Sequence, residues 1–327
     1  MQLYRAPAWL PGGNLQTIWP PFFSRPPGAP PSYRRERWDT PDGDFIDVDF
    51  LDAEAAAAIG GHSAPMLVLF HGLESSSSSN YALAFAQVAR ARGWAFVVPH
   101  FRGCSGELNR GPRAYHSGDF EEIGWLLARL RARHGAPLYA AGVSLGGNAL
   151  LRWAEEAGDS AAATARVLAA VSSPVDLAAA GHAIDRGFNR LVYSRMFLRS
   201  MKPKALAKWQ QHPGLFDRER LLRARNLYEF DNVVTAPLHG FRDTEDYWAR
   251  ASAKPHLHRI RIPTLVLNAR NDPFVPGASL PLQAQVGRFV QLWQPAQGGH
   301  VGFPQSPFPG RVLGLPEAVV GWMQAQA

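Results

Sequence analysis

Short apolar runs alternate with amphipathic segments along most of the chain. Continuous apolar runs bounded by turn residues are typical of buried strands, whereas apolar positions spaced three and four apart predict helices. The strand pattern occurs at residues 66–70, 95–98, 138–141, 167–171, 264–267 and 289–293, and the helical spacing at residues 81–92, 120–133, 148–157 and 317–324. This alternation predicts an α/β fold in which helices cover both faces of a mostly parallel central sheet.

The N-terminal part of the chain follows a different pattern. Residues 34–38 and 45–50 flank the turn signal Thr40-Pro-Asp-Gly43, which predicts an antiparallel hairpin at a sheet edge. The alanine run 55–58 predicts a loop. Residues 1–33 are rich in proline and aromatic residues, and we interpret them as a segment that wraps the domain, with a flexible arm as the alternative.

A long interval without a strand pattern separates the fourth and fifth apolar runs. Residues 195–209 within it have helical character, and a stretch of this length is expected to be helical rather than a bare loop. We interpret about 177–255 as a helical cap inserted over the carboxyl ends of the strands, where α/β proteins place their sites. Packing beside the sheet is the alternative. The core of this single domain, 1–327, then comprises residues 34–176 and 256–327.

Composition and charge exclude several classes of protein. The 327 residues contain one cysteine, Cys104, so neither an intrachain disulfide nor a cysteine metal cluster can form. The chain starts without a signal-peptide pattern and has no run of about eighteen apolar residues, so we expect a cytoplasmic protein without a stable membrane anchor. The net charge of +7 comes from scattered basic residues with no nucleic-acid-binding motif, which predicts no nucleic-acid partner. The basic and apolar helix at 195–209 leaves transient contact with acidic lipid as an alternative to an ordinary lid helix.

A candidate nucleophile lies in the sequence Gly142-Val-Ser144-Leu-Gly146. It follows a predicted strand and leads into a predicted helix, as the strained strand-to-helix turn of a nucleophile elbow requires. The flanking glycines have a steric reason, because a Cβ two residues from the serine on either side would crowd the turn. The five-residue pattern alone is a weak signal. The assignment of Ser144 as a nucleophile therefore depends on the other residues that such a site requires.

A serine nucleophile needs a base, and chain order narrows the candidates. In an α/β hydrolase the order is serine, acid, histidine, and the last two follow strand ends. His300, in Gly298-Gly-His300, follows the last predicted strand, and Asp272 follows the one before it. His300 would accept the serine proton while Asp272 orients its ring. Asp176 also follows a predicted strand and is the rival acid.

The negative oxygen of a tetrahedral intermediate must be met by preset N–H donors. The backbone amides of Leu73 and Leu145 are the candidates, since one follows the first parallel strand and the other follows the nucleophile. Under the alternative reading, His71-Gly72 is only a turn that ends a strand. The chemistry that this set predicts is acyl transfer to water.

Motifs in the same order resemble the YheT-like serine hydrolases, a branch of the α/β-hydrolase superfamily. The matching pieces are Asn14-Leu-Gln-Thr17, His71-Gly-Leu-Glu74, Asn80-Tyr81, Phe101-Arg-Gly-Cys-Ser-Gly106, Tyr115-His-Ser-Gly118, Gly142-Val-Ser-Leu-Gly-Gly-Asn148, Phe230-Asp231 with Thr235, Gly240-Phe241, Tyr247 and Gly299-His300. The resemblance spans nearly the whole chain.

The resemblance implies an esterase-like hydrolase with Ser144, Asp272 and His300 as its triad, no metal and no cofactor. Small-molecule acyl esters are the implied substrates, and we expect short to medium acyl chains. Eukaryotic relatives act on acylglycerols and phospholipids, which keeps a lipase or phospholipase as an alternative. A thioesterase or an acyltransferase could use the same triad, and a non-catalytic scaffold is the least favoured reading.

Further residues in these motifs leave two readings open. Arg102, Tyr115 and His116 could lock a loop or bind a polar group of the substrate, and we favour the structural role. Asp231 in the predicted cap is likewise read as a scaffold acid. Cys104 has no base nearby in the sequence, which argues against a nucleophilic or redox role.

Overall fold

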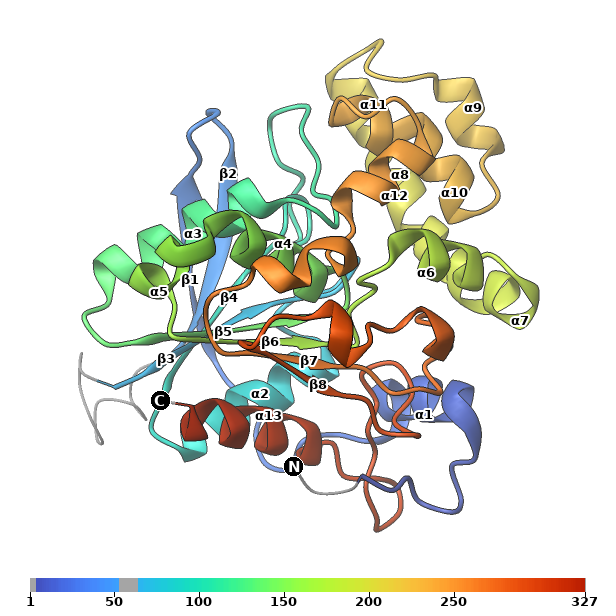
Figure 1. The fold of residues 1–327 in the computed structure, drawn as a ribbon. Coiled ribbons are helices and arrows are strands. Elements are labelled where there is room, and N and C mark those ends of the chain that lie inside the picture. The colour runs from blue at the N-terminus through green and yellow to red at the C-terminus, as the bar shows by residue number, and fades with distance from the viewer. Residues whose placement is uncertain (1–3, 53–63, 327) are drawn as a thin grey trace.

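The computed structural model describes residues 4–52 and 64–326, and the predicted loop at 55–58 lies outside them. In the described residues, eight strands form one sheet in the order β1-β2-β4-β3-β5-β6-β7-β8 (Figure 1). The strands are β1 (Tyr33–Asp39), β2 (Phe45–Leu51), β3 (Met66–Phe70), β4 (Ala95–Pro99), β5 (Leu138–Val143), β6 (Val167–Val171), β7 (Thr264–Leu267) and β8 (Val290–Trp293). The predicted hairpin is present, because β1 pairs antiparallel with β2, and β2 with β4, while β3 to β8 are parallel.

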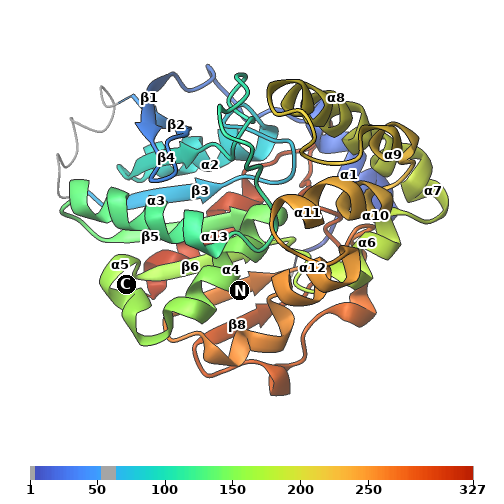
Figure 2. The ribbon, with the colours of Figure 1, turned by 90° about the horizontal axis from the view of Figure 1, so that it is seen from above.

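Helices cover both faces of the sheet, as predicted (Figures 1 and 2). One face carries α2 (Asn80–Ala91) and α13 (Gly314–Ala325), and the other carries α3 (Phe120–Arg133), α4 (Leu145–Ala157) and the short α5 (Ala161–Thr164). Strand β3 shows why its sequence is continuously apolar. Its side chains are all buried and alternate between the two layers, which is the expected consequence of helices on both faces.

The chain between β6 and β7 is helical, as the cap interpretation requires. Its core is built from apolar side chains of α8 to α10, including Leu198, Leu221 and Phe230. The helices are α6 (Leu177–Ile184), α7 (Gly187–Asn189), α8 (Arg195–Gln211), α9 (Arg218–Arg223), α10 (Leu227–Phe230), α11 (Ala236–Leu238) and α12 (Thr244–Ala251). Within the described part of the chain, no helix is both long and apolar enough to cross a membrane.

A helix that the sequence did not predict lies near the N-terminus. Helix α1 (Gly12–Phe23) contains Pro20 and Pro21 in its last turn and begins with two glycines, and these residues mask the helical pattern. Proline leaves an N–H missing and disfavours the helix interior, so the segment reads as irregular from its composition. The Asn80 side chain at the start of α2 donates to the backbone oxygens of Pro20 and Ser24, which fixes the end of α1 against the core.

Candidate active site

Ser144 occupies the sharp turn between β5 and α4. Its φ of 52° and ψ of −120° place it in a strained region, and its N–H donates to the Val171 oxygen over 2.8 Å. A Cβ on Gly142 would lie 2.5 Å from the Gly146 oxygen, and one on Gly146 would lie 2.5 Å from the Phe70 oxygen. Only glycine fits at both positions, which is the steric reason expected from the sequence.

The structure brings Ser144, His300 and Asp272 into one hydrogen-bonded row. The distance from Ser144 Oγ to His300 Nε2 is 3.0 Å, and the distance from His300 Nδ1 to Asp272 Oδ2 is 2.9 Å. The second oxygen of Asp272, Oδ1, accepts from the N–H groups of Phe274 at 2.8 Å and Val275 at 3.3 Å. The Asp272 side chain is fully buried, so its carboxylate is held in one orientation toward the histidine.

Asp176, the rival acid, has other partners. Its side chain caps α6 by accepting from the Ala179 N–H at 3.1 Å, and it lies 3.4 Å from Lys254 Nζ. Among the residues described, the carboxylate that contacts His300 is that of Asp272. The sequence left the choice open because both acids follow the end of a strand.

Helix α1 supports the loops that carry the acid and the base, a role that the sequence analysis missed. Gln16 Oε1 accepts from Asn271 Nδ2 and from the Gly298 N–H, both over 2.9 Å. Thr17 Oγ1 accepts from the N–H of His300 over 2.8 Å. The sequence indicated this segment only through the Asn14-Leu-Gln-Thr17 motif of the family resemblance. That motif assigned no role to Gln16 or Thr17.

The two candidate oxyanion donors have free N–H groups. Among the described residues, neither the Leu73 nor the Leu145 amide has a hydrogen-bond acceptor, and both residues line the same cavity as Ser144 and His300. Leu145 is the first residue of α4, where helical N–H groups have no acceptor within the helix.

Side-chain hydroxyls fix the loop around Leu73. Tyr81 OH accepts from the Gly72 N–H over 2.8 Å and donates to Ser75 Oγ over 2.7 Å. Tyr115 OH accepts from the Glu74 N–H over 3.0 Å and donates to Glu74 Oε1 over 2.8 Å. The contacts of Tyr115 are therefore structural, although its ring also lines the cavity.

His71 ties the end of β3 to the end of β4. Its Nδ1 donates to the Gly72 oxygen over 2.8 Å, and its Nε2 accepts from the Phe101 N–H over 3.0 Å. Complete burial lowers the pKa of His71 to about 3, so the ring is neutral and can accept through one nitrogen while it donates through the other. His71 therefore has a structural role, because it connects the loops that follow β3 and β4.

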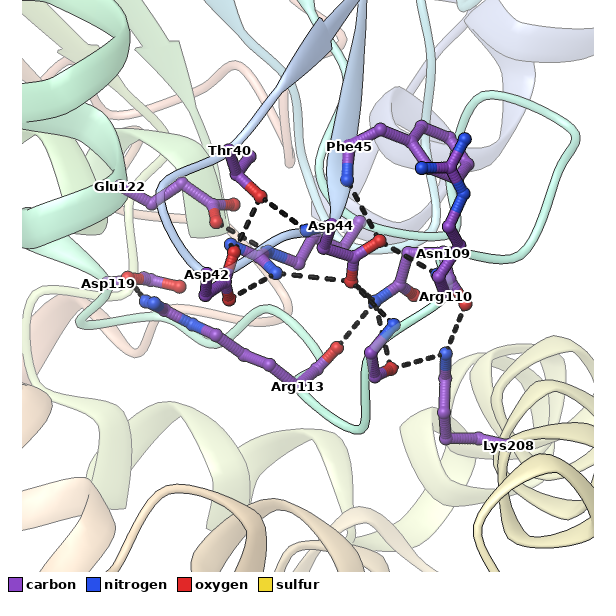
Figure 3. A network of polar contacts seen from close by, with 12 residues as sticks. Thr40, Asp42, Asp44, Phe45, Asn109, Arg110, Arg113, Asp119, Glu122 and Lys208 are labelled. Carbon is purple, nitrogen blue, oxygen red and sulfur yellow. Dashed lines mark hydrogen bonds and ion pairs between the residues drawn. The ribbon is translucent and has the colours of Figure 1, made fainter.

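Arg102 is part of a buried polar network that joins the β1–β2 turn to α3. Figure 3 shows members of this network from both elements, with Asp42, Asp44 and Glu122 labelled. The Arg102 guanidinium donates to Glu122 Oε2 at 2.6 Å, to Asp42 Oδ2 at 2.8 Å and to Asp44 Oδ2 at 3.2 Å. The Arg102 side chain is only 2% exposed. Lys208 of α8 donates to the Gly111 oxygen over 2.7 Å, which attaches the cap to the same network.

We expect Arg102→Met to destabilise the fold by about 3–5 kcal/mol, because it would leave buried carboxylates without their cation. The measurement is the free energy of unfolding in urea. Arg242→Met is the matched control, since its pair with Asp243 is exposed and should contribute little to stability. Equal, small losses for the two variants would contradict a structural role for Arg102.

Two further residues with an open role, Asp231 and His116, are half-buried at the cavity wall. Asp231 accepts from Thr235 Oγ1 at 2.7 Å and from Trp248 Nε1 at 3.0 Å, and burial raises its pKa to about 6. Burial lowers the pKa of His116 to about 3, and its ring centroid lies 4.3 Å from that of His239. The contacts of Asp231 lie within residues 177–255, whereas His116 of the core contacts His239 of that segment. Both sets of contacts agree with a structural role.

Cys104 is a free, buried thiol. Burial raises its pKa to about 11, so the thiol is protonated at neutral pH and is a poor nucleophile. This environment agrees with the sequence-based reading of Cys104 as a residue without redox or nucleophilic chemistry.

Ser144 and His300 open into a cavity between the core and the cap. It comprises about 1280 Å³ of space free of protein atoms, part of it open to solvent. The cap contributes mostly apolar side chains to the wall. These include Leu177, Ile184, Phe197, Met201, Phe230 and Val234. Such a cavity can hold a hydrocarbon chain beside the serine hydroxyl.

Known proteins share both the sequence and the fold. Residues 65–307 match the family described as alpha/beta hydrolase fold. The chain is 40% identical over 293 residues to the Escherichia coli (strain K12) protein named "Putative esterase YheT", covering 89% of this chain and 84% of that protein. It is 29% identical over 311 residues to Phospholipase ABHD3 of Mus musculus, covering 94% and 75% of the two chains.

A solved structure shares the fold at low sequence identity. Est1E from Butyrivibrio proteoclasticus, with ferulic acid bound, has a TM-score of 0.56 and 15% identity, and the match covers 90% of this chain and 98% of that one. The chain therefore belongs to the α/β-hydrolase fold family. Within that family it belongs to the YheT-like group, as its motifs predicted.

Proposed function

We propose that this chain is a serine hydrolase that cleaves carboxylic esters through an acyl-enzyme intermediate. The observation that carries the proposal is the row Ser144 Oγ, His300 and Asp272, with distances of 3.0 and 2.9 Å, at the wall of an apolar cavity. Membership of the α/β-hydrolase family and relatives named as an esterase and a phospholipase support it.

In the acylation step, Ser144 Oγ attacks the ester carbonyl while His300 Nε2 accepts its proton. The Leu73 and Leu145 amides donate to the oxygen that becomes negative. Asp272 accepts from Nδ1 and stabilises the imidazolium. When the tetrahedral intermediate collapses, the bond to the alcohol oxygen breaks and His300 gives its proton to the departing alcohol.

In the deacylation step, a water molecule takes the place of the alcohol. His300 removes a proton from the water, the oxygen attacks the acyl carbonyl, and the second tetrahedral intermediate is held by the same two amides. Collapse releases the carboxylic acid and returns the proton to Ser144. The overall reaction converts an ester and water to an acid and an alcohol.

Short to medium acyl chains are the proposed acyl groups, because the cavity beside Ser144 is apolar and bounded by cap helices. We expect turnover of p-nitrophenyl esters to pass through a maximum at short or medium acyl length, measured as kcat/KM for soluble substrates. Ser144→Ala supplies the background rate for each ester. Activity found only with aggregated long-chain lipid would instead assign a lipase, and preference for thioesters would assign a thioesterase.

A further inference from the structure

Acidic residues are absent from three long segments of the sequence. Residues 1–35, 186–216 and 273–316 contain no Asp or Glu, although the chain has 27 of them in all. The same segments hold basic residues: four arginines in the first, four arginines and three lysines in the second, and two arginines in the third. Segments that carry basic but no acidic residues can form a positively charged surface only if the fold brings them together.

The fold places parts of these three segments on one side of the molecule, whereas residues 33–35 lie in the edge strand β1 and residues 290–293 lie in β8. Each pair of segments is joined by a hydrogen bond, and α1 and α7 lie on the same side in both views (Figures 1 and 2). The bonds run from Tyr193 OH to Asn14 Oδ1 at 2.9 Å, from Asn189 Nδ2 to the Pro273 oxygen at 2.7 Å and from Trp19 Nε1 to the Pro309 oxygen at 2.7 Å. We call the surface formed by the exposed residues of 9–25, 186–199 and 308–311 the acid-free face.

Large apolar side chains are exposed on the acid-free face. Phe22 of α1 is 68% exposed, Leu191 of the cap is 57% exposed and Phe308 is 69% exposed. Others that are exposed are Leu15, Phe23, Phe188 and Met196. Leu15 and Phe22 are seven residues apart on α1 and therefore share one side of that helix. A concentration of this kind marks an interaction surface.

Aromatic rings anchor part of this surface. Trp19 lies at ring-centroid distances of 5.6 Å from Trp9, 4.2 Å from Phe23 and 5.9 Å from Phe308. Tryptophan and phenylalanine rings gather at the boundary between lipid headgroups and acyl chains, because their large apolar surface is favourable there.

Unpaired arginines accompany the apolar side chains. Arg25, Arg186, Arg190, Arg195 and Arg199 are exposed, and none of them forms an ion pair within residues 4–52 and 64–326. The neighbouring acid Asp185 has other partners, since it accepts from Ser194 Oγ and from the N–H groups of Leu227 and Tyr228. The face therefore presents five exposed arginines without an ion-pair partner in the described residues.

The three lysines of α8, in contrast to these arginines, have hydrogen-bond or ion-pair partners. Lys208 is buried against backbone oxygens, Lys202 donates to the oxygens of Leu222 and Ala224, and Lys204 pairs with Glu74. The exposed side of this helix, for which the sequence left lipid contact as an alternative, carries Arg195, Met196 and Arg199.

We propose that the acid-free face docks reversibly on an anionic lipid bilayer. The exposed phenylalanine and leucine side chains enter the interface, and the arginines contact the negative headgroups. The positive charge of the face favours a lipid bilayer over a second copy of the chain. In a symmetric dimer, two such faces would meet and repel each other. A nucleic acid would match the arginines but would leave the exposed aliphatic side chains in water.

The same segments reach the cavity. Phe197 and Met201 come from the second segment, and Phe274 and His300 come from the third, and all four line the cavity wall. Docking on this face would place the enzyme's cavity beside the lipid layer. The inference does not require that the chain hydrolyse an ester, so it can fail while the proposed function holds.

Vesicle flotation tests the proposal with the full chain carrying Ser144→Ala, so that no lipid is hydrolysed. The probes are vesicles of phosphatidylcholine alone and of phosphatidylcholine mixed with phosphatidylglycerol. We expect binding to the mixed vesicles, at least about tenfold weaker binding to neutral ones, and loss of the difference in high salt. No binding to the mixed vesicles, or equal binding to both kinds, would overturn it.

Two paired variants locate the surface. Arg190→Glu with Arg195→Glu should weaken binding to the mixed vesicles by at least about tenfold, and Phe22→Ser with Leu191→Ser should weaken it by a similar factor. Arg90→Glu with Arg166→Glu is the matched control, because both residues are exposed at the opposite, amino end of the strands.

Circular dichroism and the unfolding midpoint check that every variant is folded. If the Arg90→Glu and Arg166→Glu control lost as much vesicle binding as the Arg190→Glu and Arg195→Glu variant, binding would depend on net charge alone. That result would overturn the assignment of this face. A wild-type dimer in light scattering that Leu191→Ser dissociates, without vesicle binding, would assign the face to a second copy of the chain.

Discussion

Ser144→Ala is expected to lose fluorophosphonate labelling completely and to lower ester turnover by at least about 10⁴-fold. The alanine removes the only atom that can form the acyl-enzyme bond in the proposed mechanism, while the strained turn and the cavity remain. Gel fluorescence after labelling and kcat with a short p-nitrophenyl ester are the two measurements. Because the hydroxyl contacts only His300 within the described structure, the fold should be unaffected.

Ser117→Ala is the control for the nucleophile. Ser117 lines the same cavity and is buried, but its hydroxyl forms no hydrogen bond with His300 in the described residues. This variant should keep wild-type labelling and most of its turnover. Equal labelling of wild type and Ser144→Ala would refute the assignment of the nucleophile, and transfer of the loss to Ser117→Ala would identify another serine.

Asp272→Asn should lower kcat by about 10⁴-fold with little change in KM. Asparagine has nearly the same shape, but an amide N–H facing His300 Nδ1 would favour the tautomer in which Nε2 carries the proton and cannot accept from Ser144. The Oδ1 position can still accept from the Phe274 and Val275 amides, so the loop should keep its conformation. Steady-state kinetics and the thermal midpoint separate these two effects.

Asp176→Asn tests the rival acid. Its carboxylate caps α6 and lies near Lys254, so the substitution should leave kcat within a few-fold of wild type and cost about 1 kcal/mol of stability or less. The opposite pair of results, with Asp176→Asn inactive and Asp272→Asn active, would transfer the role of the acid to Asp176.

The sheet could be predicted because burial on both faces imposes an unbroken apolar run on each parallel strand. All six parallel strands, the edge hairpin and the main core helices follow from such local patterns. Helix α1 could not be predicted, because its prolines and glycines mask the apolar spacing. Its support of the site depends on contacts between residues more than 250 positions apart, which leave no periodic signal.

The candidate site could be predicted only from the order of its residues along the chain. The chain order identified His300 as the base. It limited the candidates for the acid to Asp272 and Asp176, since each follows the end of a strand. The contact with His300 depends on how the loop after β7 bends, and the Asp272 carboxylate stabilises that bend by accepting two backbone N–H groups. The acid-free face was equally hidden, because its three segments meet only in the fold.

The hydrogen bond between Thr17 and His300 spans 283 positions of the chain. During synthesis, α1 leaves the ribosome long before the loop that it supports. Until His300 and its loop follow, the Gln16 and Thr17 side-chain oxygens that later accept from this loop can only accept from water, and the apolar side of α1 has no complete partner. The geometry of the proposed base is therefore assembled only after nearly the whole chain has been made, so a nascent fragment can hold Ser144 on its turn and still have no reactive serine.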